Sequence, residues 1–145
     1  MNANFPHQYR MSLTVAEHSA RHIRRIIRTL LKEWGVEEVT EAVELAATEL
    51  VTNVVRHVPD RSCTIRIARH GSGARVEVTD RSPRLPVTLP RAPSPESENG
   101  RGLLVVEGLV DKWGVDRVPG VGKTVWFECL KAPERAASAG EPPRE

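Results

Sequence analysis

Aromatic residues are scarce in this chain of 145 residues, which has three Trp, two Phe and one Tyr. The core of the protein must therefore be built from aliphatic side chains. The net charge is only +2. Proteins that bind nucleic acid typically combine a strong basic patch with stacking aromatic side chains, so this composition argues against direct binding of nucleic acid.

Cysteine is rarer still, and Cys63 and Cys129 are the two in the chain. Each lies in a segment that predicts a strand, with no paired spacing and no neighbouring His or Cys. We therefore expect buried free thiols rather than a disulfide or a metal site. No apolar run approaches the roughly 20 residues of a membrane span, and residues 1–10 lack the hydrophobic centre of a signal peptide. We expect a cytoplasmic protein that makes no membrane contact.

The length and composition are those of one globular domain. We predict a domain at residues 12–131, preceded by an N-terminal segment at 1–11 and followed by a disordered tail at 132–145. Within it, residues 14–34 are mostly basic and residues 37–57 mostly acidic. Such a pair of segments can mark a partner surface, but two solvated helix faces with ion pairs between them are the commoner explanation.

Two amphipathic helices are predicted in the first half of the chain. In the first, apolar residues recur at steps of three and four up to Trp34, Ser12 or Thr14 could cap the start, and Gly35 ends it. The second runs from about residue 36 to 57. Its apolar stripe consists of Val39, Val43, Ala46, Leu50 and Val54.

Alternating apolar and polar residues predict strands at residues 63–69, 75–79, 112–118 and 124–130, and a short strand at 8–13. Helices followed by hairpins indicate an α+β fold. We expect a two-layer α/β sandwich, in which a mixed, mostly antiparallel sheet is covered on one face by helices.

The most informative feature is a pair of polar residues, Glu49 and Asn53, in the otherwise apolar second helix. Residues four apart lie on one face of a helix, about one turn apart. Glu49 could orient a water or accept a proton, and the side-chain oxygen of Asn53 could bind Mg²⁺. Taken singly, each is more often an ordinary polar side chain. Asn is a poor helix former, however, and this one lies among apolar residues.

Asp80 follows a predicted strand and opens a proline-rich segment, residues 81–99. A carboxylate at a strand end can accept hydrogen bonds from an exocyclic amine such as that of adenine. The alternative, which position alone favours, is an Asp that initiates a turn. The long segment 81–99 could be a lid over a binding site or a plain disordered insertion.

Gly100, Arg101 and Gly102 join this segment to a predicted short helix at residues 103–110. Glycine lets the backbone approach a ligand closely, and a helix N-terminus offers unpaired N–H groups to phosphate. A flexible joint is the alternative. The later sequence GVGKT, which ends at Thr124, is not a P-loop, because Arg117 stands where that motif needs its first glycine and a strand follows.

Together these motifs resemble those of the histidine-kinase-like ATPase superfamily, in their order and across residues 12–130. The segment ELVTN from Glu49 is similar to its N box, DRSP from Asp80 to its first glycine box, GRGL from Gly100 to its second, and GKT from Gly122 to its final element. Each motif is weak alone, but their order and spacing together are specific. The resemblance implies the superfamily's α/β sandwich.

Within the superfamily the sequence looks most like bacterial anti-sigma factors with serine protein kinase activity. Such proteins bind a sigma factor and use ATP to phosphorylate an anti-anti-sigma protein on serine. The resemblance therefore implies ATP and Mg²⁺ as cofactors, these two proteins as partners, and a homodimer, which relatives often form.

The resemblance also implies a role for each motif. Asn53 would bind Mg²⁺, which bridges the phosphates, and Glu49 would act as the base on the attacking hydroxyl. Asp80 would hold the adenine amine, with Thr124 near the base. The remaining nucleotide-binding residues would come from the second glycine box, at the lid: Gly100, Arg101, Gly102 and Leu103.

One position departs from the pattern of the family. The first glycine box normally has glycine two residues after its aspartate, and this chain has Ser82 there, followed by Pro83. The departure motivates an alternative function, a non-catalytic binding module that sequesters a sigma factor or other regulator with or without ATP. His18 and His22 lie in the first helix without a dimerisation hairpin, which argues against a complete sensor histidine kinase.

Overall fold

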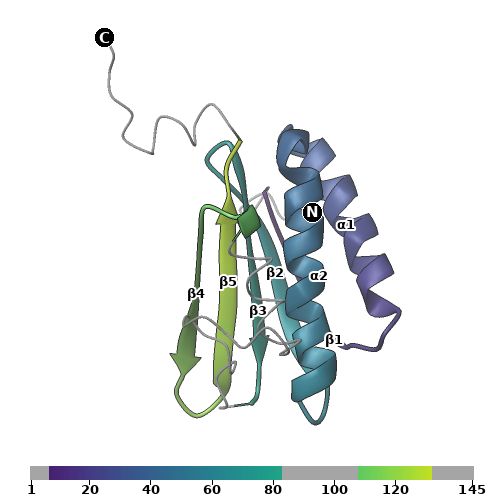
Figure 1. The fold of residues 1–145 in the computed structure, drawn as a ribbon, viewed down its shortest axis with the longest axis vertical. Coiled ribbons are helices and arrows are strands. Elements are labelled where there is room, and N and C mark those ends of the chain that lie inside the picture. Colours follow the sequence, from purple (N-terminus) through teal and green to yellow (C-terminus); the bar gives the residue numbers. More distant parts are fainter. Residues whose placement is uncertain (1–6, 83–107, 132–145) are drawn as a thin grey trace.

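The computed structural model describes residues 7–82 and 108–131 (Figure 1). Helices α1 (Ser19–Glu33) and α2 (Thr40–His57) follow the first strand, with a short 3₁₀ helix η1 (Glu37–Val39) between them. The strands are β1 (Gln8–Thr14), β2 (Ser62–His70), β3 (Gly73–Asp80), β4 (Lys112–Val118) and β5 (Gly122–Cys129).

The five strands form one sheet in the order β1-β2-β3-β5-β4, and every neighbouring pair is antiparallel. Both helices lie on one side of this sheet (Figure 1). The predicted two-layer α/β sandwich is therefore confirmed. The described sheet is antiparallel throughout, rather than mixed. β1 begins at Gln8 and so crosses residue 12, where we placed the start of the domain.

The core lies between the helices and the sheet and is mainly aliphatic, as the scarcity of aromatics requires. The predicted apolar stripe of α2 is buried, with Val43 and Ala46 fully inaccessible. The aromatic exceptions among the buried core residues that the structure describes are Phe127, at 0% exposure, and Trp34, at 8%. The sheet contributes one face of alternating residues, which include Ile65, Ile67, Val76, Val78 and Val125.

Helix α1 begins later than we predicted. Ser12 and Thr14 belong to β1, so the prediction that either caps this helix is wrong. The chain instead makes a reciprocal contact one turn further on. The Ala16 N–H donates to Ser19 Oγ at 2.8 Å, and the Ser19 N–H donates to the Ala16 carbonyl at 2.9 Å. These two local hydrogen bonds, one to the Ser19 side chain and one from its backbone, fix the turn that precedes the helix.

The end of α1 agrees with the sequence. Gly35 has φ of 74°, a left-handed conformation that glycine adopts without strain. The Val36 N–H then donates to the Leu31 carbonyl at 2.9 Å, and the Gly35 N–H to that of Lys32 at 3.2 Å. These two bonds form a Schellman motif. The chain next makes η1 rather than continuing directly into α2.

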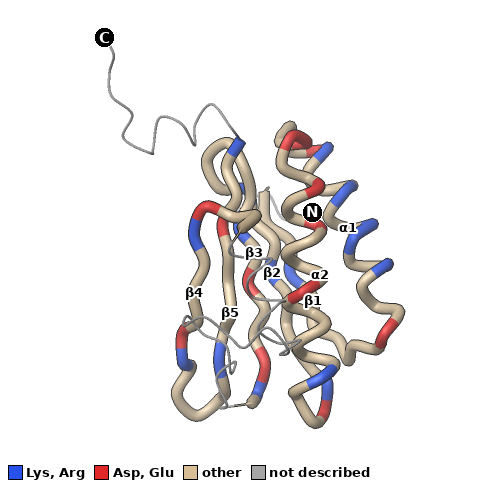
Figure 2. The backbone as a smooth tube through the Cα atoms, viewed as in Figure 1, with Lys and Arg blue, Asp and Glu red and all other residues tan. Residues whose placement is uncertain are grey.

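Two basic residues of α1 contact polar residues of α2. Arg28 Nε lies 2.9 Å from Glu44 Oε2, and the Arg24 guanidinium donates to Thr48 Oγ1 at 3.4 Å. The hydrogen bond and the charge of Glu44 raise the pKa of Arg28. The first contact is an ion pair between the two helices, along which Figure 2 shows the charged residues. Because the Arg28 side chain is 64% exposed, the pair contributes little to stability.

The predicted hairpins are present, and their turns contain Gly71 with φ of 57° and Gly120 with φ of 77°. The predicted tail at residues 132–145, most of the proposed lid and most of the predicted helix at 103–110 lie outside the described residues. Among the described residues, no helix is long and apolar enough to cross a membrane.

Candidate functional site

The topology brings three predicted motifs to one end of the sheet. Strand register pairs Cys63 near the start of β2 with Asp80 at the end of β3, and Asp80 with Lys123 near the start of β5. Helix α2 contacts both β3 and β5, and residues 58–61 connect its end to β2. The C-terminal part of α2 therefore lies at the same end of the sheet as Asp80 (Figure 1).

Glu49 and Asn53 lie on the flank of α2 that is turned away from α1. Glu44 and Thr48, which contact α1, precede them by five residues each. At 3.6 residues per turn, five residues correspond to a rotation of about 140° around the helix. Both side chains are half-buried, and no described residue forms a hydrogen bond or an ion pair with either of them. Both remain available to a ligand.

Asp80 is buried in a compact polar cluster. Its Oδ1 atom accepts from Lys123 Nζ at 2.9 Å and from the Ser82 N–H at 2.8 Å. Lys123 Nζ also donates to the Ser82 carbonyl at 3.4 Å. Asp80 is 4% exposed and Lys123 is 6% exposed, so both charges lie within the protein and neutralise one another there.

Lys123 is the functional candidate that the sequence reasoning missed. The signal was present in the alternation of β5, because Val125 and Phe127 face the core and Lys123 precedes them by two and four residues. Residues separated by two share a face of a strand. The residue that contacts Asp80 from β5 is therefore Lys123 and not its neighbour Thr124.

Ser82, which replaces the usual glycine, contributes through its backbone. Its N–H binds the Asp80 carboxylate and its carbonyl accepts from Lys123. Arg61 is the one non-glycine residue with positive φ in the described parts of the chain. The backbone at Ser82 thus has a conformation that does not require glycine, and the departure from the family pattern is compatible with this local structure.

Gly122 allows the close approach of β5 to the end of β3. A Cβ atom at this position would lie 2.0 Å from the Asp80 carbonyl oxygen and 2.7 Å from the backbone of Arg81. Any larger residue would push the two strands apart at the Asp80–Lys123 pair. The glycine of this motif therefore has a packing role that does not depend on a ligand.

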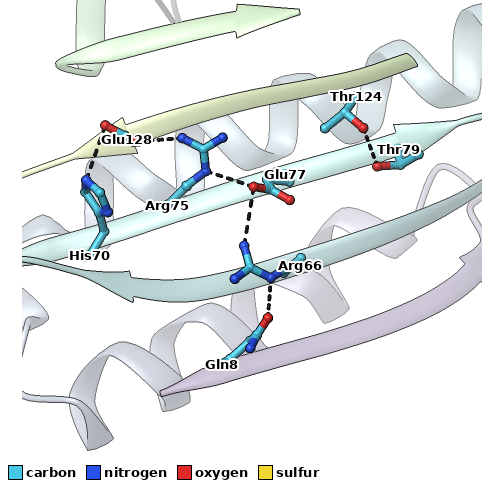
Figure 3. A network of polar contacts seen from close by, with 8 residues as sticks. All are labelled: Gln8, Arg66, His70, Arg75, Glu77, Thr79, Thr124 and Glu128. Carbon is cyan, nitrogen blue, oxygen red and sulfur yellow. Dashed lines mark hydrogen bonds and ion pairs between the residues drawn. The ribbon is translucent and has the colours of Figure 1, made fainter. Parts of the chain in front are cut away.

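Thr124 lies on the other face of the sheet. Its hydroxyl is 2.7 Å from that of Thr79, which is its register partner on β3. Figure 3 shows the two side chains on the sheet face opposite the helices. The structure brings Lys123, and not Thr124, to the face where Asp80 lies.

Cys63 borders the cluster from β2. Burial, followed by the negative charge of Asp80, raises the pKa of its thiol from 9.0 to about 11. Cys63 and Cys129 are both buried free cysteines, as the sequence predicted. A thiol with so high a pKa is a weak nucleophile at neutral pH, because the thiolate is the reactive form.

A second polar cluster covers the open face of the sheet. Arg75 lies between Glu77 and Glu128, and its guanidinium stacks 4.2 Å from the centre of the Trp126 ring. His70 Nε2 lies 3.4 Å from Glu128 on its other side. Figure 3 shows this network running across the sheet and continuing through Arg66 to Gln8. Its contacts are mutual, which indicates a structural role for the cluster.

Comparison with known proteins identifies the family. The sequence pattern of the histidine kinase-like ATPase domain matches residues 13–129, which is most of the chain. This chain belongs to the histidine kinase-like ATPase domain family. Membership implies that the domain binds ATP.

Two further comparisons found similar proteins. An uncharacterized protein of Streptomyces coelicolor is 36% identical over 98 residues, which cover 66% of this chain and 84% of that protein. The crystal structure of the RsbU and RsbW domains of Rv1364c from Mycobacterium tuberculosis matches with a TM-score of 0.59 at 24% identity. That match covers 86% of this chain and 33% of the other, and it supports the fold.

In an ATPase domain, a magnesium ion can be bound mainly by the phosphates of the nucleotide, with few ligands from the protein. The polar side chains of α2 are compatible with such a site. No group of three or more His, Cys, Asp and Glu that could hold a metal occurs within the described ranges. Mg²⁺ commonly keeps several waters and binds through one or two protein oxygens together with substrate phosphates. The uncommitted side-chain oxygen of Asn53 meets this requirement. Gly100, Arg101, Gly102 and Leu103 lie outside the described residues.

Proposed function

We propose that this ATPase domain binds Mg-ATP between α2 and the C-terminal end of β3 and transfers the γ-phosphoryl group to a serine of a partner protein. One observation supports this proposal above the others. The topology places the uncommitted Glu49 and Asn53 at the same end of the sheet as the buried carboxylate of Asp80. These groups would supply the activating carboxylate and the metal ligand that phosphoryl transfer needs, together with a carboxylate for binding the nucleotide base.

Each residue would act through ordinary chemistry. Asp80 would accept a hydrogen bond from the exocyclic amine of adenine, and Asn53 would present its side-chain oxygen to Mg²⁺. When bound, the ion would neutralise charge on the phosphate oxygens. Glu49 would orient the serine hydroxyl and take its proton during attack on the γ-phosphorus.

The partners in this proposal are a sigma factor, which the protein would sequester, and an anti-anti-sigma protein, which it would phosphorylate. The motifs of the chain support this choice, because the ELVTN and GRGL segments resemble those of anti-sigma factors with kinase activity. The solved structure with the same fold, which contains RsbU and RsbW domains, is in keeping with a regulatory protein partner.

Binding and transfer can be tested separately. Isothermal titration with Mg-ATP should show that Asn53→Ala weakens binding at least about tenfold, because one hydrogen bond or ligand is lost from a charged partner. Glu49→Gln should bind nearly as well as the wild type. Its rate of phosphoryl transfer from labelled ATP to an anti-anti-sigma protein should fall about 10²- to 10⁴-fold. Glu41→Gln, in the first turn of α2, is the matched control.

A second candidate is a binding module without catalysis. The observation that favours it is the ion pair of Asp80 with Lys123, which already occupies one oxygen of the proposed base-binding carboxylate. Under this alternative Glu49→Gln would leave every measured property unchanged, and sequestration of the sigma factor would persist. No binding of Mg-ATP at millimolar concentration would rule out the kinase.

A further inference from the structure

The buried pair of Asp80 and Lys123 needs an explanation beyond stability. Both side chains lie within the protein, at 4% and 7% exposure. Removing two charges from water costs several kcal/mol per ion, and replacing a buried pair with apolar residues is often neutral or stabilising. A pair that is retained in such a place can instead fix the position of a functional group.

The contacts of Asp80 are unequal between its two oxygens. Oδ1 accepts from Lys123 Nζ at 2.9 Å and from the Ser82 N–H at 2.8 Å. Within residues 7–82 and 108–131, no donor contacts Oδ2. Two donors from separate segments, the side chain of β5 and the backbone that follows β3, therefore hold one oxygen and leave the other for a ligand.

We infer that Lys123 is a positioning residue that pins Oδ1 of Asp80, so that Oδ2 is presented to the nucleotide base as a hydrogen-bond acceptor. This inference rests on the proposed function and adds its specificity. An acceptor in this position pairs with the 6-amino group of adenine. Opposite the 6-oxo group of hypoxanthine or guanine, the Asp80 oxygen would meet a second acceptor, and no hydrogen bond could form. A buried polar group left unpaired in this way strongly disfavours binding.

The arrangement also predicts what an amide would do in place of the carboxylate. In Asp80→Asn, the donors Lys123 Nζ and Ser82 N–H would require the amide oxygen at the position of Oδ1. The NH₂ group would then take the position of Oδ2 and offer a donor to the base. A site that accepts a hydrogen bond from a 6-amino group would become a site that donates one to a 6-oxo group. This inversion depends on the pinning by Lys123 and Ser82.

The experiment compares the affinities for ATP and for ITP, which replaces the 6-amino group by oxygen. Isothermal titration in Mg²⁺ would be made on the wild type, Lys123→Met, Asp80→Asn and the control Lys112→Met, whose lysine is exposed on β4. Melting temperature without nucleotide would report folding. We expect the wild type and Lys112→Met to prefer ATP. In Lys123→Met the ratio of the two dissociation constants should shrink about tenfold, the effect of one hydrogen bond to a charged group.

Asp80→Asn should prefer ITP, and this variant tests the pinned orientation of residue 80 even if Lys123→Met does not fold. A Lys123→Met protein that folds and discriminates as the wild type does would overturn the inference. So would an Asp80→Asn protein without a preference for ITP. If the wild type binds neither nucleotide, the proposed function fails and this inference fails with it, a result distinct from unchanged discrimination.

Discussion

The hydroxyls of Thr79 and Thr124 meet at 2.7 Å on the face of the sheet opposite the helices. Their sequence neighbours, Asp80 and Lys123, meet at 2.9 Å on the helix face. The same two strands thus carry two polar pairs that differ in position by one residue and point to opposite sides. Of the four residues, Asp80 and Lys123 lie on the face of the sheet where we propose that the nucleotide binds.

Thr124→Val should therefore leave Mg-ATP affinity within about twofold of the wild type, because Thr124 lies on the opposite face of the sheet from the proposed site. Loss of a hydrogen bond to the ligand would lower the affinity by more than this. The free energy of unfolding should fall by about 1 kcal/mol, since the Thr79 hydroxyl loses its partner. Isothermal titration and urea unfolding measure the two effects. Thr79→Val combined with Thr124→Val should cost less than the sum of the single changes. A tenfold loss of Mg-ATP affinity in Thr124→Val would contradict this prediction and show that Thr124 contributes to nucleotide binding.

Gly122→Ala should destabilise the protein and weaken ATP binding together. The new methyl group would lie 2.0 Å from the Asp80 carbonyl oxygen, so the backbone must move. Overpacking of this kind costs about 1–3 kcal/mol, measurable by urea unfolding. Gly108→Ala is the control, because nothing lies within 4 Å of its Cβ position. Equal stability of the two variants would contradict the close approach described for β5.

The elements that local pattern determines were predictable from the sequence. The apolar stripe of α2 and the alternation of β2 and β3 repeat with the periods of a helix and a strand, and the structure places them as predicted. Gly35 was recognisable for the same reason, because the Schellman ending is a local backbone requirement. Motif order suggested Glu49, Asn53 and Asp80 as candidate site residues, and topology brings their segments to one end of the sheet.

What the sequence reasoning missed depends on contacts between distant segments. Whether Lys123 or Thr124 faces Asp80 is set by the register of β5 against β3, and a shift of one residue reverses the faces of a strand. A buried lysine is also rare without a partner, and its partner Asp80 lies 43 residues away in the sequence. The prediction of where α1 starts was wrong for a different reason. Ser12 and Thr14 have side chains that often cap helices, but both belong to a strand that pairs with β2.

Arg75→Met should lower the free energy of unfolding by about 1–3 kcal/mol, because it removes hydrogen bonds to two carboxylates and the stacking on Trp126. The Glu128 side chain is 11% exposed, so it would lose a partner in a place with little water. Urea unfolding measures the change. Arg10→Met is the matched control, since Arg10 is exposed on β1 and makes no ion pair with any residue that the structure describes. A loss in Arg75→Met no greater than in the control would mean that the network contributes nothing measurable.

Cys63 should make stability fall at alkaline pH. Burial and the charge of Asp80 raise the pKa of its thiol from 9.0, its ordinary value, to about 11. Above pH 9 the unfolded chain therefore loses this proton while the folded protein keeps it, so the stability present below pH 9 declines as pH rises towards 11. The decline attributable to Cys63 should reach about 2 kcal/mol by pH 11.

Urea unfolding of the wild type and Cys63→Ala from pH 7 to 11 isolates this contribution, because the other titrating groups are common to both proteins. The wild type should lose more stability than the variant as the pH rises through this window. An independent measurement follows from the same pKa. At pH 9 a thiol reagent should modify Cys63 far more slowly in the folded protein than in urea, since the folded site holds little thiolate. Parallel stability curves for the two proteins would show that Asp80 and burial do not suppress ionisation of Cys63, and would place its thiol nearer to water than the structure does.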